Sequence, residues 1–383
     1  MDMIKLIKNG EVYAPEYLGK QTVLVVDHKI AKIGEVNEAI LNTDLDVEVI
    51  DAEGCIVMPG MIDPHVHLIG GGGEGGFATR TPEIQLSDIV RSGITTVVGC
   101  LGTDGTTRHM TSLLAKARGL EEEGITTFIY TGNYHVPTPT ITCCVKDDII
   151  IVDKIIGAGE IAISDSRSAQ PSVHEIAKLV AEARIGGLLS GKAGVTHFHI
   201  GPGKQRLQFL HQIMEDYEIP ASKIYCTHIT RSKELVDDAI TLANKGSFVD
   251  MTADNDTGEW FSYYKENGGD LNQLTFSSDG NGSLPVFDQN GKLMGIGVAS
   301  TYTLYETFVA TVRDQGCPLE EVIPVVTSNT ATALQLKHKG RLVKGNDADL
   351  LLLDKDQLAI RHVFAKGKQM VKNGEVIVKG TFE

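Results

Sequence analysis

The sequence predicts an α/β protein in which a (β/α)8 TIM-like barrel, residues 58–339, carries a small β-sandwich domain built from both termini, residues 1–57 and 340–383. Two observations predict this division. In the middle of the chain, apolar strand-like segments alternate with amphipathic helices, as in βα units around a parallel sheet. At both ends, short alternating segments are separated by turns. The 383 residues are enough for a barrel of about 250 residues and a second domain.

The terminal segments show the period-two alternation of β-strands. LIKNGEVY (6–13) and DVEVIDAEGCIVM (46–58) contain Asn-Gly and Glu-Gly pairs, which predict β-hairpin turns. IKNGEVY at 7–13 is nearly repeated as VKNGEVI at 371–377. Because two such similar stretches stand at opposite ends, we expect both termini to build one small β domain together.

Eight candidate strands follow one another in the central part of the chain. Helical segments such as 111–124, 172–187 and 233–246 separate several of them. Eight strands suit a closed barrel, whose functional residues belong at the carboxyl ends of the strands and in the loops that follow. The strands are GMIDPHVH (60–67), GITTVVGC (93–100), TTFIYTGNY (126–134), IAISD (161–165), VTHFHI (195–200), IYCTHI (224–229), SFVDMT (247–252) and LTFSSD (274–279).

The overall charge favours a small-molecule substrate. The formal net charge is −15, whereas nucleic acids and anionic membranes need clustered Lys and Arg, so we expect neither as a partner.

The chain has no secretory signal pattern and no apolar run of about 18 residues, which predicts a cytoplasmic protein. The six cysteines form no C-x-x-C pair, so neither a zinc knuckle nor a disulfide framework is indicated. Cys143 and Cys144 are adjacent and are candidates for exposure.

Residue types that bind metals gather at the predicted strand ends. Alternation sends residues i and i+2 to one side of a strand, so His65 and His67 can share one ion. Imidazole and carboxylate together suit zinc and similar divalent ions. The other candidates are Glu160, near the start of the fourth strand, and His199, His228 and Asp279, at the ends of strands five, six and eight.

Each histidine alone has a simpler interpretation, because a lone buried histidine is more often a hydrogen-bonded core residue than a ligand. His197 and His199 form a second His-x-His pair. We select His199 as the ligand because it is nearer the strand end. The joint pattern is more specific than any of its members.

These motifs resemble those of the amidohydrolase superfamily and, within it, those of the isoaspartyl (β-aspartyl) dipeptidases. The resemblance spans nearly the whole chain. It implies metal-dependent hydrolysis of isoaspartyl dipeptides, and it also implies a homo-oligomer. The segments that carry it are PGMIDPHVHLIGGGGE, TRTPE, GTDGTTRH, TGNYHVP, SDSRSA, FHIG, THITR, SSDGNGS and GNDADLLL.

By the same resemblance, the barrel holds two divalent metal ions, generally Zn²⁺. His65 and His67 match the ligands of the more buried ion, and His199 and His228 match those of the second. Asp279 matches the acid that binds the buried ion and acts as general base and acid for a metal-bridging hydroxide.

The resemblance also assigns the residues that receive a zwitterionic dipeptide. Glu74, set among glycines in GGGGEGG, matches the acid that binds the α-ammonium group. A flexible loop or a phosphate cradle is the alternative for this segment, but no Gly-Lys-Ser/Thr follows it. The remaining matches are Gly72 and Thr103 for the aspartyl part, Arg167, Arg231 and Ser283 for carboxylates, and Tyr134 as the catalytic donor to the scissile carbonyl.

One position departs from the family pattern. The family bridges its two ions with a carboxylated lysine just before the A-I-S-D run, and here Glu160 stands at that place in GAGEIAISD. The local spacing differs by one residue. Lys154 lies six residues upstream, too far to substitute without remodelling. We therefore assign the bridge to Glu160.

Two alternatives remain open. Another amidohydrolase activity, on a cyclic amide, an N-acyl amino acid or a deaminase substrate, would use the same metal ligands. A non-catalytic relative would have lost such ligands, which all persist here. Glu74, Tyr134, Arg167 and Arg231 together favour the dipeptidase.

Overall fold

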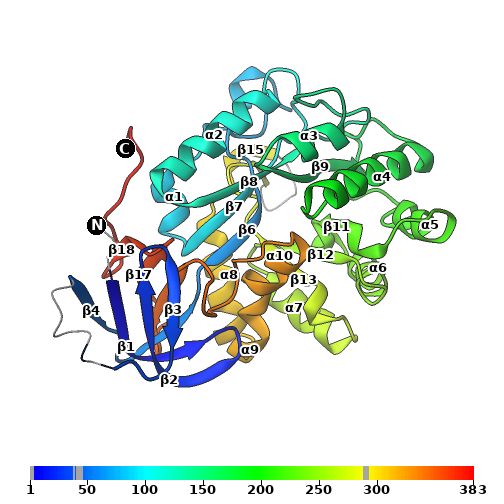
Figure 1. Cartoon of the computed structure of the whole chain (residues 1–383). Coiled ribbons are helices and arrows are strands. Elements are labelled where there is room, and N and C mark those ends of the chain that lie inside the picture. Colours follow the sequence, from blue (N-terminus) through cyan, green and yellow to red (C-terminus); the bar gives the residue numbers. More distant parts are fainter. Residues whose placement is uncertain (1–3, 38, 40–45, 288–292) are drawn as a thin grey trace.

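The computed structural model describes residues 4–37, 39, 46–287 and 293–383. Its central feature is an eight-stranded parallel sheet in the order β13-β12-β11-β10-β9-β8-β7-β6. An isolated parallel bridge between Val66 and Gly280 joins the two ends of this sheet, and helices surround it (Figure 1). This confirms the predicted barrel. Its strands are β6 (Met61–Val66), β7 (Ile94–Gly99), β8 (Thr126–Thr131), β9 (Ile155–Ile163), β10 (Val195–Ile200), β11 (Ile224–Thr227), β12 (Phe248–Thr252) and β13 (Leu274–Ser277).

The barrel strands are buried over almost their whole length because helices cover the outside and side chains fill the inside. α4 begins with a capping box in which Ser172 and Glu175 satisfy each other's backbone N–H groups. The helices are α1 (Leu86–Val90), α2 (Met110–Glu123), α3 (Val145–Ile151), α4 (Val173–Ser190), α5 (Gln208–Asp216), α6 (Lys233–Ala243), α7 (Thr257–Glu266), α8 (Tyr302–Arg313), α9 (Leu319–Val322) and α10 (Ser328–Ala333). In these described residues, no helix is both long and apolar enough to cross a bilayer.

Both ends of the chain form one β domain, as predicted, and its strands join in a nine-stranded sheet. This domain encloses a separate core that includes Val12, Val23, Leu352 and Phe364. Residues 1–3, 38 and 40–45 of the predicted domain lie outside the described residues, and the exact boundaries stay a prediction. The strands are β1 (Ile4–Tyr13), β2 (Tyr17–Val26), β3 (Lys29–Ile33), β4 (Val47–Asp51), β5 (Cys55–Pro59), β16 (Leu350–Asp354), β17 (Ile360–Ala365), β18 (Lys368–Lys372) and β19 (Glu375–Val376).

Two of the expected hairpin turns are wrong. Asn9 and Gly10 lie inside β1, where the pairing with β2 shifts register. A Cβ at Gly10 would lie 2.5 Å from Val57 Cγ2, so the glycine permits a close approach within the strand rather than a turn. β4 and β5, on either side of the Glu-Gly pair, each pair in parallel with β1. The second Asn-Gly pair, Asn373–Gly374, does join two antiparallel strands, β18 and β19.

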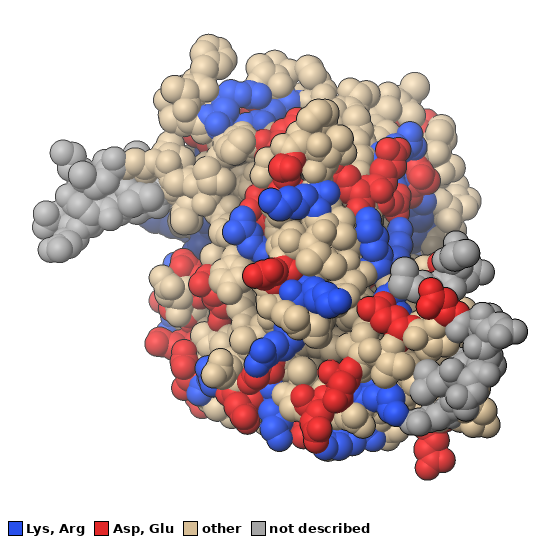
Figure 2. All heavy atoms as spheres, turned by 90° about the vertical axis from the view of Figure 1, so that its left-hand side faces the viewer, with Lys and Arg blue, Asp and Glu red and all other residues tan. Residues whose placement is uncertain are grey.

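The surface in Figure 2 carries acidic and basic side chains side by side. Interspersed charges of both signs are typical of a solvated protein surface.

A buried ion cluster links the barrel to the β domain. Nζ of Lys339 lies 2.6 Å from Oγ1 of Thr126, at the start of β8, and 2.6 Å from Oδ2 of Asp349, just before β16. Oδ2 of Asp347 lies 2.8 Å from the same Nζ. Burial would lower the pKa of Lys339, but the two aspartates outweigh it and raise that pKa.

We expect Lys339→Met to lower the free energy of unfolding by about 3–5 kcal/mol, because it leaves the buried carboxylate of Asp349 without its cation. Urea denaturation followed by circular dichroism measures this loss. Arg118→Met is the control: Arg118 pairs with Asp153 on the surface, and an exposed pair contributes at most about 1 kcal/mol. Equal losses of unfolding free energy in the two variants would show that the buried cluster stabilises the protein no more than an exposed ion pair does.

Candidate metal centre and substrate cavity

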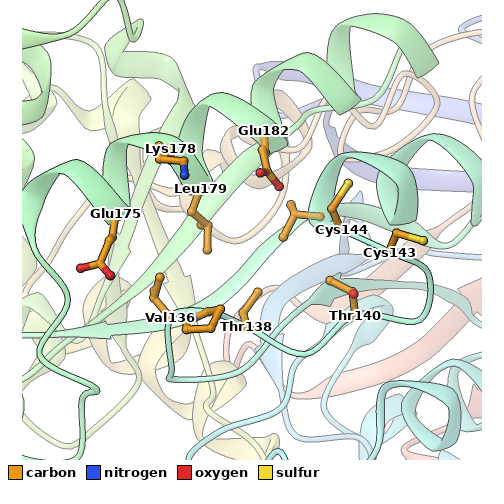
Figure 3. A pocket seen from close by; sticks show the side chains of 11 residues that line it. Val136, Thr138, Thr140, Cys143, Cys144, Glu175, Lys178, Leu179 and Glu182 are labelled. Carbon is orange, nitrogen blue, oxygen red and sulfur yellow. The ribbon is translucent and has the colours of Figure 1, made fainter.

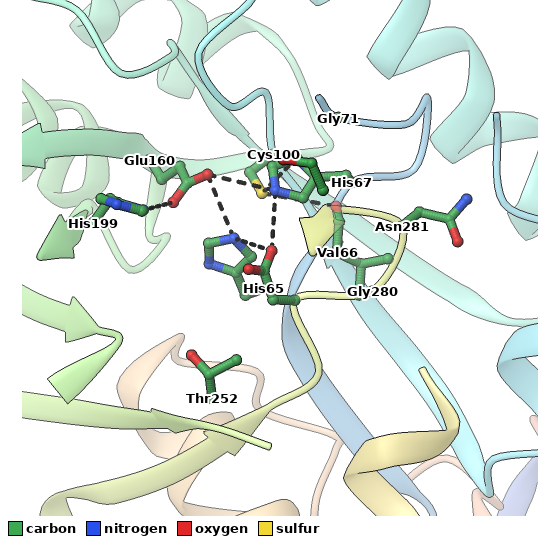
Figure 4. A network of polar contacts seen from close by, with 12 residues as sticks. His65, Val66, His67, Gly71, Cys100, Glu160, His199, Thr252, Gly280 and Asn281 are labelled. Carbon is green, nitrogen blue, oxygen red and sulfur yellow. Dashed lines mark hydrogen bonds and ion pairs between the residues drawn. The ribbon is translucent and has the colours of Figure 1, made fainter. Parts of the chain in front are cut away.

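The predicted ligands meet at the carboxyl end of the barrel. His65 lies near the end of β6 and His67 directly follows that strand, while His199 lies in β10 (Figure 4). His228 and Asp279 follow β11 and β13, with φ angles of 64° and 52°. Residues other than glycine rarely adopt this left-handed conformation, and such strain is concentrated at functional sites.

The carboxylate of Glu160 lies between the two histidine pairs. Its Oε1 is 3.5 Å from Nε2 of both His65 and His67. Its Oε2 is 3.1 Å from Nδ1 of His199 and 3.7 Å from Nε2 of His228. One carboxylate therefore presents a separate oxygen to each pair of histidines.

Glu160 reaches this position from the middle of β9, which begins at Ile155 and not near Glu160 as the sequence suggested. Lys154 lies just before the opposite end of this strand. Its Nζ donates to the carbonyl oxygen of Thr127 at 3.0 Å and pairs with Glu121. Lys154 is therefore held away from the histidines.

Asp279 completes the cluster on the side of the first histidine pair. Its Oδ1 is 3.3 Å from Nε2 of His65 and 3.1 Å from Nε2 of His67. Within the described residues, His65 Nε2, Glu160 Oε1 and Asp279 Oδ1 are buried atoms without a hydrogen-bond partner. Burying such atoms is costly unless another group satisfies them. A divalent cation among them would do so, and this donor set therefore fits a metal.

The electrostatics of the cluster keep the acids anionic. Burial alone would raise the pKa of Glu160, but His65 and His199 hold it well below the usual range. Asp279 behaves in the same way beside His65. Burial and the neighbouring His199 lower the pKa of His228 to about 3. Burial alone would lower the pKa of His65 and His67, but Cys100 and Asp279, together with Glu160 at His65, raise it well above the usual value. Anionic carboxylates and neutral imidazoles are the forms that bind metal ions, so metal binding would release the protons of these two rings.

Three residues that sequence reasoning did not select also belong to this region. Asp165 Oδ2 is 3.0 Å from Nε2 of His199, so it can orient the ring whose Nδ1 faces Glu160. The sulfur of Cys100 lies 3.9 Å from Nδ1 of His67 and joins one of the candidate ligand groups. His197, the rejected member of the second pair, contacts His65. Cys100 and Asp165 each end a predicted strand, and this position could have marked them as candidate site residues.

The cluster opens into a cavity of about 560 Å³. The predicted catalytic residue Tyr134 lines it, together with all the predicted substrate-binding residues: Gly72, Glu74, Thr103, Arg167, Arg231 and Ser283. Leu284 and Ile296 also line it, from a hairpin of β14 (Ser283–Phe287) and β15 (Leu293–Val298) that the sequence did not predict.

Glu74 is held at the rim of this cavity by hydroxyl groups. Oγ1 of Thr103 donates to its Oε1 at 3.0 Å, and Oγ of Ser283 donates to its Oε2 at 3.4 Å. Gly72, with φ of 74°, needs its lack of a side chain, because a Cβ would lie 2.5 Å from the carbonyl oxygen of Thr79. The glycine-rich segment is therefore a shaped wall of the cavity.

Arg167 lies between two acids, Asp165 and Glu74. Its Nε and Nη2 donate to the two oxygens of Asp165 at 3.0 and 2.8 Å, and its Nη1 is 3.5 Å from Oε1 of Glu74. Nη2 of Arg231 approaches Nε2 of His199 to 3.4 Å. Both guanidinium groups thus border the metal-ligand cluster.

Tyr134 reaches the same cluster from the loop after β8. Its hydroxyl lies 2.9 Å from Nδ1 of His199, and the guanidinium of Arg167 sits over its ring at 5.2 Å. Burial raises the pKa of Tyr134 well above the usual value. Its hydroxyl therefore keeps its proton and can donate a hydrogen bond into the cavity.

A second cavity, of about 420 Å³, lies between α4 and the loop that follows Tyr134 (Figure 3). Cys143 and Cys144 line it as free cysteines, Cys143 exposed and Cys144 half-buried. Glu175 and Glu182 of α4 face it from the other side. None of the predicted metal or substrate residues lines this cavity.

Comparison with known proteins identifies the family. Models described as amidohydrolase family match residues 48–110 and 264–381. The crystal structure of a β-aspartyl dipeptidase from Fervidobacterium islandicum AW-1, in complex with a β-Asp-Leu dipeptide, is 46% identical to the chain, with a TM-score of 0.92. The alignment covers 98% of each chain. The chain belongs to the β-aspartyl dipeptidase family.

Relatives outside the β-aspartyl dipeptidase family are more distant. A D-hydantoinase from Thermus sp. has a TM-score of 0.67 at 16% identity, covering 98% of this chain and 97% of that one, which shows the common fold. The dihydroorotase of Staphylococcus epidermidis is 38% identical over 94 residues, only 24% of this chain and 21% of that protein.

Proposed function

We propose that this protein is a metal-dependent dipeptidase that hydrolyses isoaspartyl (β-aspartyl) dipeptides. The observation that carries this proposal is the 46% identity, over 98% of both chains, to a β-aspartyl dipeptidase bound to β-Asp-Leu. The arrangement of the cavity supports it, because beside the metal-ligand cluster the cavity presents the carboxylate of Glu74 and the guanidinium groups of Arg167 and Arg231. A dipeptide carries an ammonium group and carboxylates that such residues can receive.

Two divalent ions, Zn²⁺ by the chemistry of the donors, would be held in this cluster. His65, His67 and Asp279 would hold one ion, His199 and His228 the other, and Glu160 would be shared. When bound, such ions lower the pKa of a water molecule and polarise the substrate carbonyl. The separate orientation of the two Glu160 oxygens supports the shared role.

The rim residues would orient the dipeptide. Glu74 receives the α-ammonium group, and Gly72 and Thr103 complete the wall around the aspartyl part. Arg167, Arg231 and Ser283 receive carboxylate oxygens. Binding both charged ends fixes the scissile amide over the cluster and raises the reaction rate by restricting its orientation.

Two side chains would handle the chemistry of the amide. Tyr134 donates a hydrogen bond to the carbonyl oxygen as negative charge develops there. Asp279 takes a proton from the attacking water and passes it to the leaving nitrogen. A C–O bond forms, the C–N bond breaks, and the products are aspartate and the second amino acid.

Hydrolysis of a cyclic amide is the second candidate, favoured by the partial similarity to dihydroorotase. It uses the same metal ligands but gives no task to the Glu74 acid and the pair of arginines. Assaying β-Asp-Leu beside dihydroorotate and N-acetyl amino acids separates the candidates. Hydrolysis of dihydroorotate without hydrolysis of β-Asp-Leu would overturn the dipeptidase assignment.

We also propose that the protein forms a homo-oligomer. Its cytoplasmic location stays a prediction. An apolar face on α3 and α4 supports self-association, since Ile151, Leu188 and Leu189 are 69%, 64% and 70% exposed. Light scattering on the purified protein measures its mass in solution. A mass of a single chain would rule out the oligomer.

We expect Asp279→Asn to lower the turnover of β-Asp-Leu by at least about 10²- to 10⁴-fold, since an amide cannot relay the proton. Asparagine tolerates the left-handed backbone of this position, so the variant should keep its circular dichroism spectrum. Turnover within tenfold of the unmodified protein would contradict the assigned role.

For Glu74→Gln, the loss of kcat/KM should be larger on β-Asp-Leu than on an analogue of β-Asp-Leu that lacks the α-ammonium group. An unpaired charge in such a contact costs about 2–5 kcal/mol, and the analogue has no such charge. Glu83→Gln serves as the control, because Glu83 pairs with Lys116 outside the cavity. Equal losses on both substrates would exclude Glu74 as the ammonium receptor.

Glu160→Gln should lose much of its bound metal, because it keeps the shape but removes the charge that offsets repulsion between two cations. Metal content by mass spectrometry measures this, with Glu160→Asp as the charge-retaining comparison. A bridging lysine must first be carboxylated by carbon dioxide, whereas a glutamate is anionic without modification. The apoprotein should therefore regain the same metal content with and without bicarbonate. Full metal content in Glu160→Gln, or a bicarbonate requirement, would assign the bridge to another residue.

A further inference from the structure

His197 lies directly behind the metal-ligand cluster. It is fully buried on β10, and its Nε2 is 2.9 Å from Nδ1 of His65. Its ring stacks on Tyr130 with centroids 4.9 Å apart and an interplanar angle of 13°. Tyr225 contacts the ring edge-on at 4.8 Å. The imidazole is therefore fixed in position between two aromatic side chains.

His197 also packs against the strand that carries Glu160. A Cβ on Gly159, which precedes Glu160, would lie 2.8 Å from Cβ of His197. The pairing of β9 with β10 shifts register between Thr196 and Phe198, at His197 itself. His197 thus contacts the side chain of His65, at one end of the cluster, and the backbone of Gly159, which precedes Glu160.

The direction of the hydrogen bond between His65 and His197 decides whether His65 can bind a metal. A neutral imidazole has one N–H, so His65 offers the lone pair of Nε2 only when its proton is on Nδ1. The Nδ1–H then donates to Nε2 of His197. The reverse direction would place the proton of His65 on Nε2, which faces Glu160 and Asp279.

Packing alone does not explain an imidazole at position 197. Its Nδ1 is buried without a hydrogen-bond partner among the described residues, which costs free energy that an apolar side chain would avoid. The contact of its Nε2 with His65 is the interaction that an apolar side chain would lose.

We propose that His197 is a positioning residue of the metal centre, which accepts the Nδ1–H of His65 and so keeps Nε2 of His65 free for the ion. This inference rests on the proposed metal centre but not on the identity of the substrate. Partners that fix the tautomer of a ligand histidine typically contribute 10- to 100-fold to metal affinity.

The test compares His197→Gln with His197→Asn. The amide oxygen of glutamine can reach the position of Nε2, whereas that of asparagine is one methylene too short. Apoprotein is titrated with Zn²⁺ against a chromophoric chelator, and circular dichroism and thermal unfolding check that each variant is folded. We expect about 10- to 100-fold weaker Zn²⁺ binding at one site in His197→Asn and binding within about threefold of the unmodified protein in His197→Gln.

His197→Leu, which fills the space without an acceptor, should bind Zn²⁺ as weakly as His197→Asn. Equal weakening in the glutamine and asparagine variants would mean that His197 acts through packing, and unchanged affinity in the asparagine variant would mean that it has no role. Either result overturns the proposal. Because the readout is metal affinity, it is independent of whether the unmodified protein hydrolyses β-Asp-Leu, which tests the proposed function separately.

Discussion

The position of one buried carboxylate organises the functional end of this protein. The two oxygens of Glu160 are directed to different histidine pairs, so that one negative charge lies between His199 on β10 with His228 and the histidines around β6. The barrel provides the rigid frame, since Glu160 sits in mid-strand with both faces of β9 buried. A carboxylate taken out of water is costly unless it is paired, so the cluster and the acid depend on one another.

The sequence was sufficient to predict the barrel and the terminal β domain, because buried parallel strands and amphipathic helices leave strong patterns in the chain. It was insufficient where one local pattern fits two structures. Asn9–Gly10 and Asn373–Gly374 have the same letters, yet the first lies in a bulged strand and the second in a hairpin turn. At Gly10 the strand runs so close to Val57 of β5, which is distant in the sequence, that a Cβ would not fit, and the letters Asn-Gly do not reveal this contact.

The same limit applies to the functional site. Residues next to strand ends were selected because a barrel brings those ends together, and the structure gathers His65, His67, His199, His228 and Asp279 there. Residues that contact the candidate ligands from outside the cluster were not selected. His197 becomes recognisable only when distances are known, because sequence alternation cannot tell which histidine of a His-x-His pair faces the cluster. Asp165 ends a predicted strand, but only its distance to His199 shows what it contacts.

Arg167 gives the site a further property. A continuous path of polar contacts runs from Glu74 at the rim through Arg167 and His199 to Glu160. A ligand that attracts the guanidinium away from Asp165 changes the field at His199, a candidate metal ligand. Thermodynamic linkage then makes the effect reciprocal: whatever factor the ligand contributes to metal affinity, the metal contributes to ligand affinity. We therefore expect binding at the rim and binding in the cluster to be coupled.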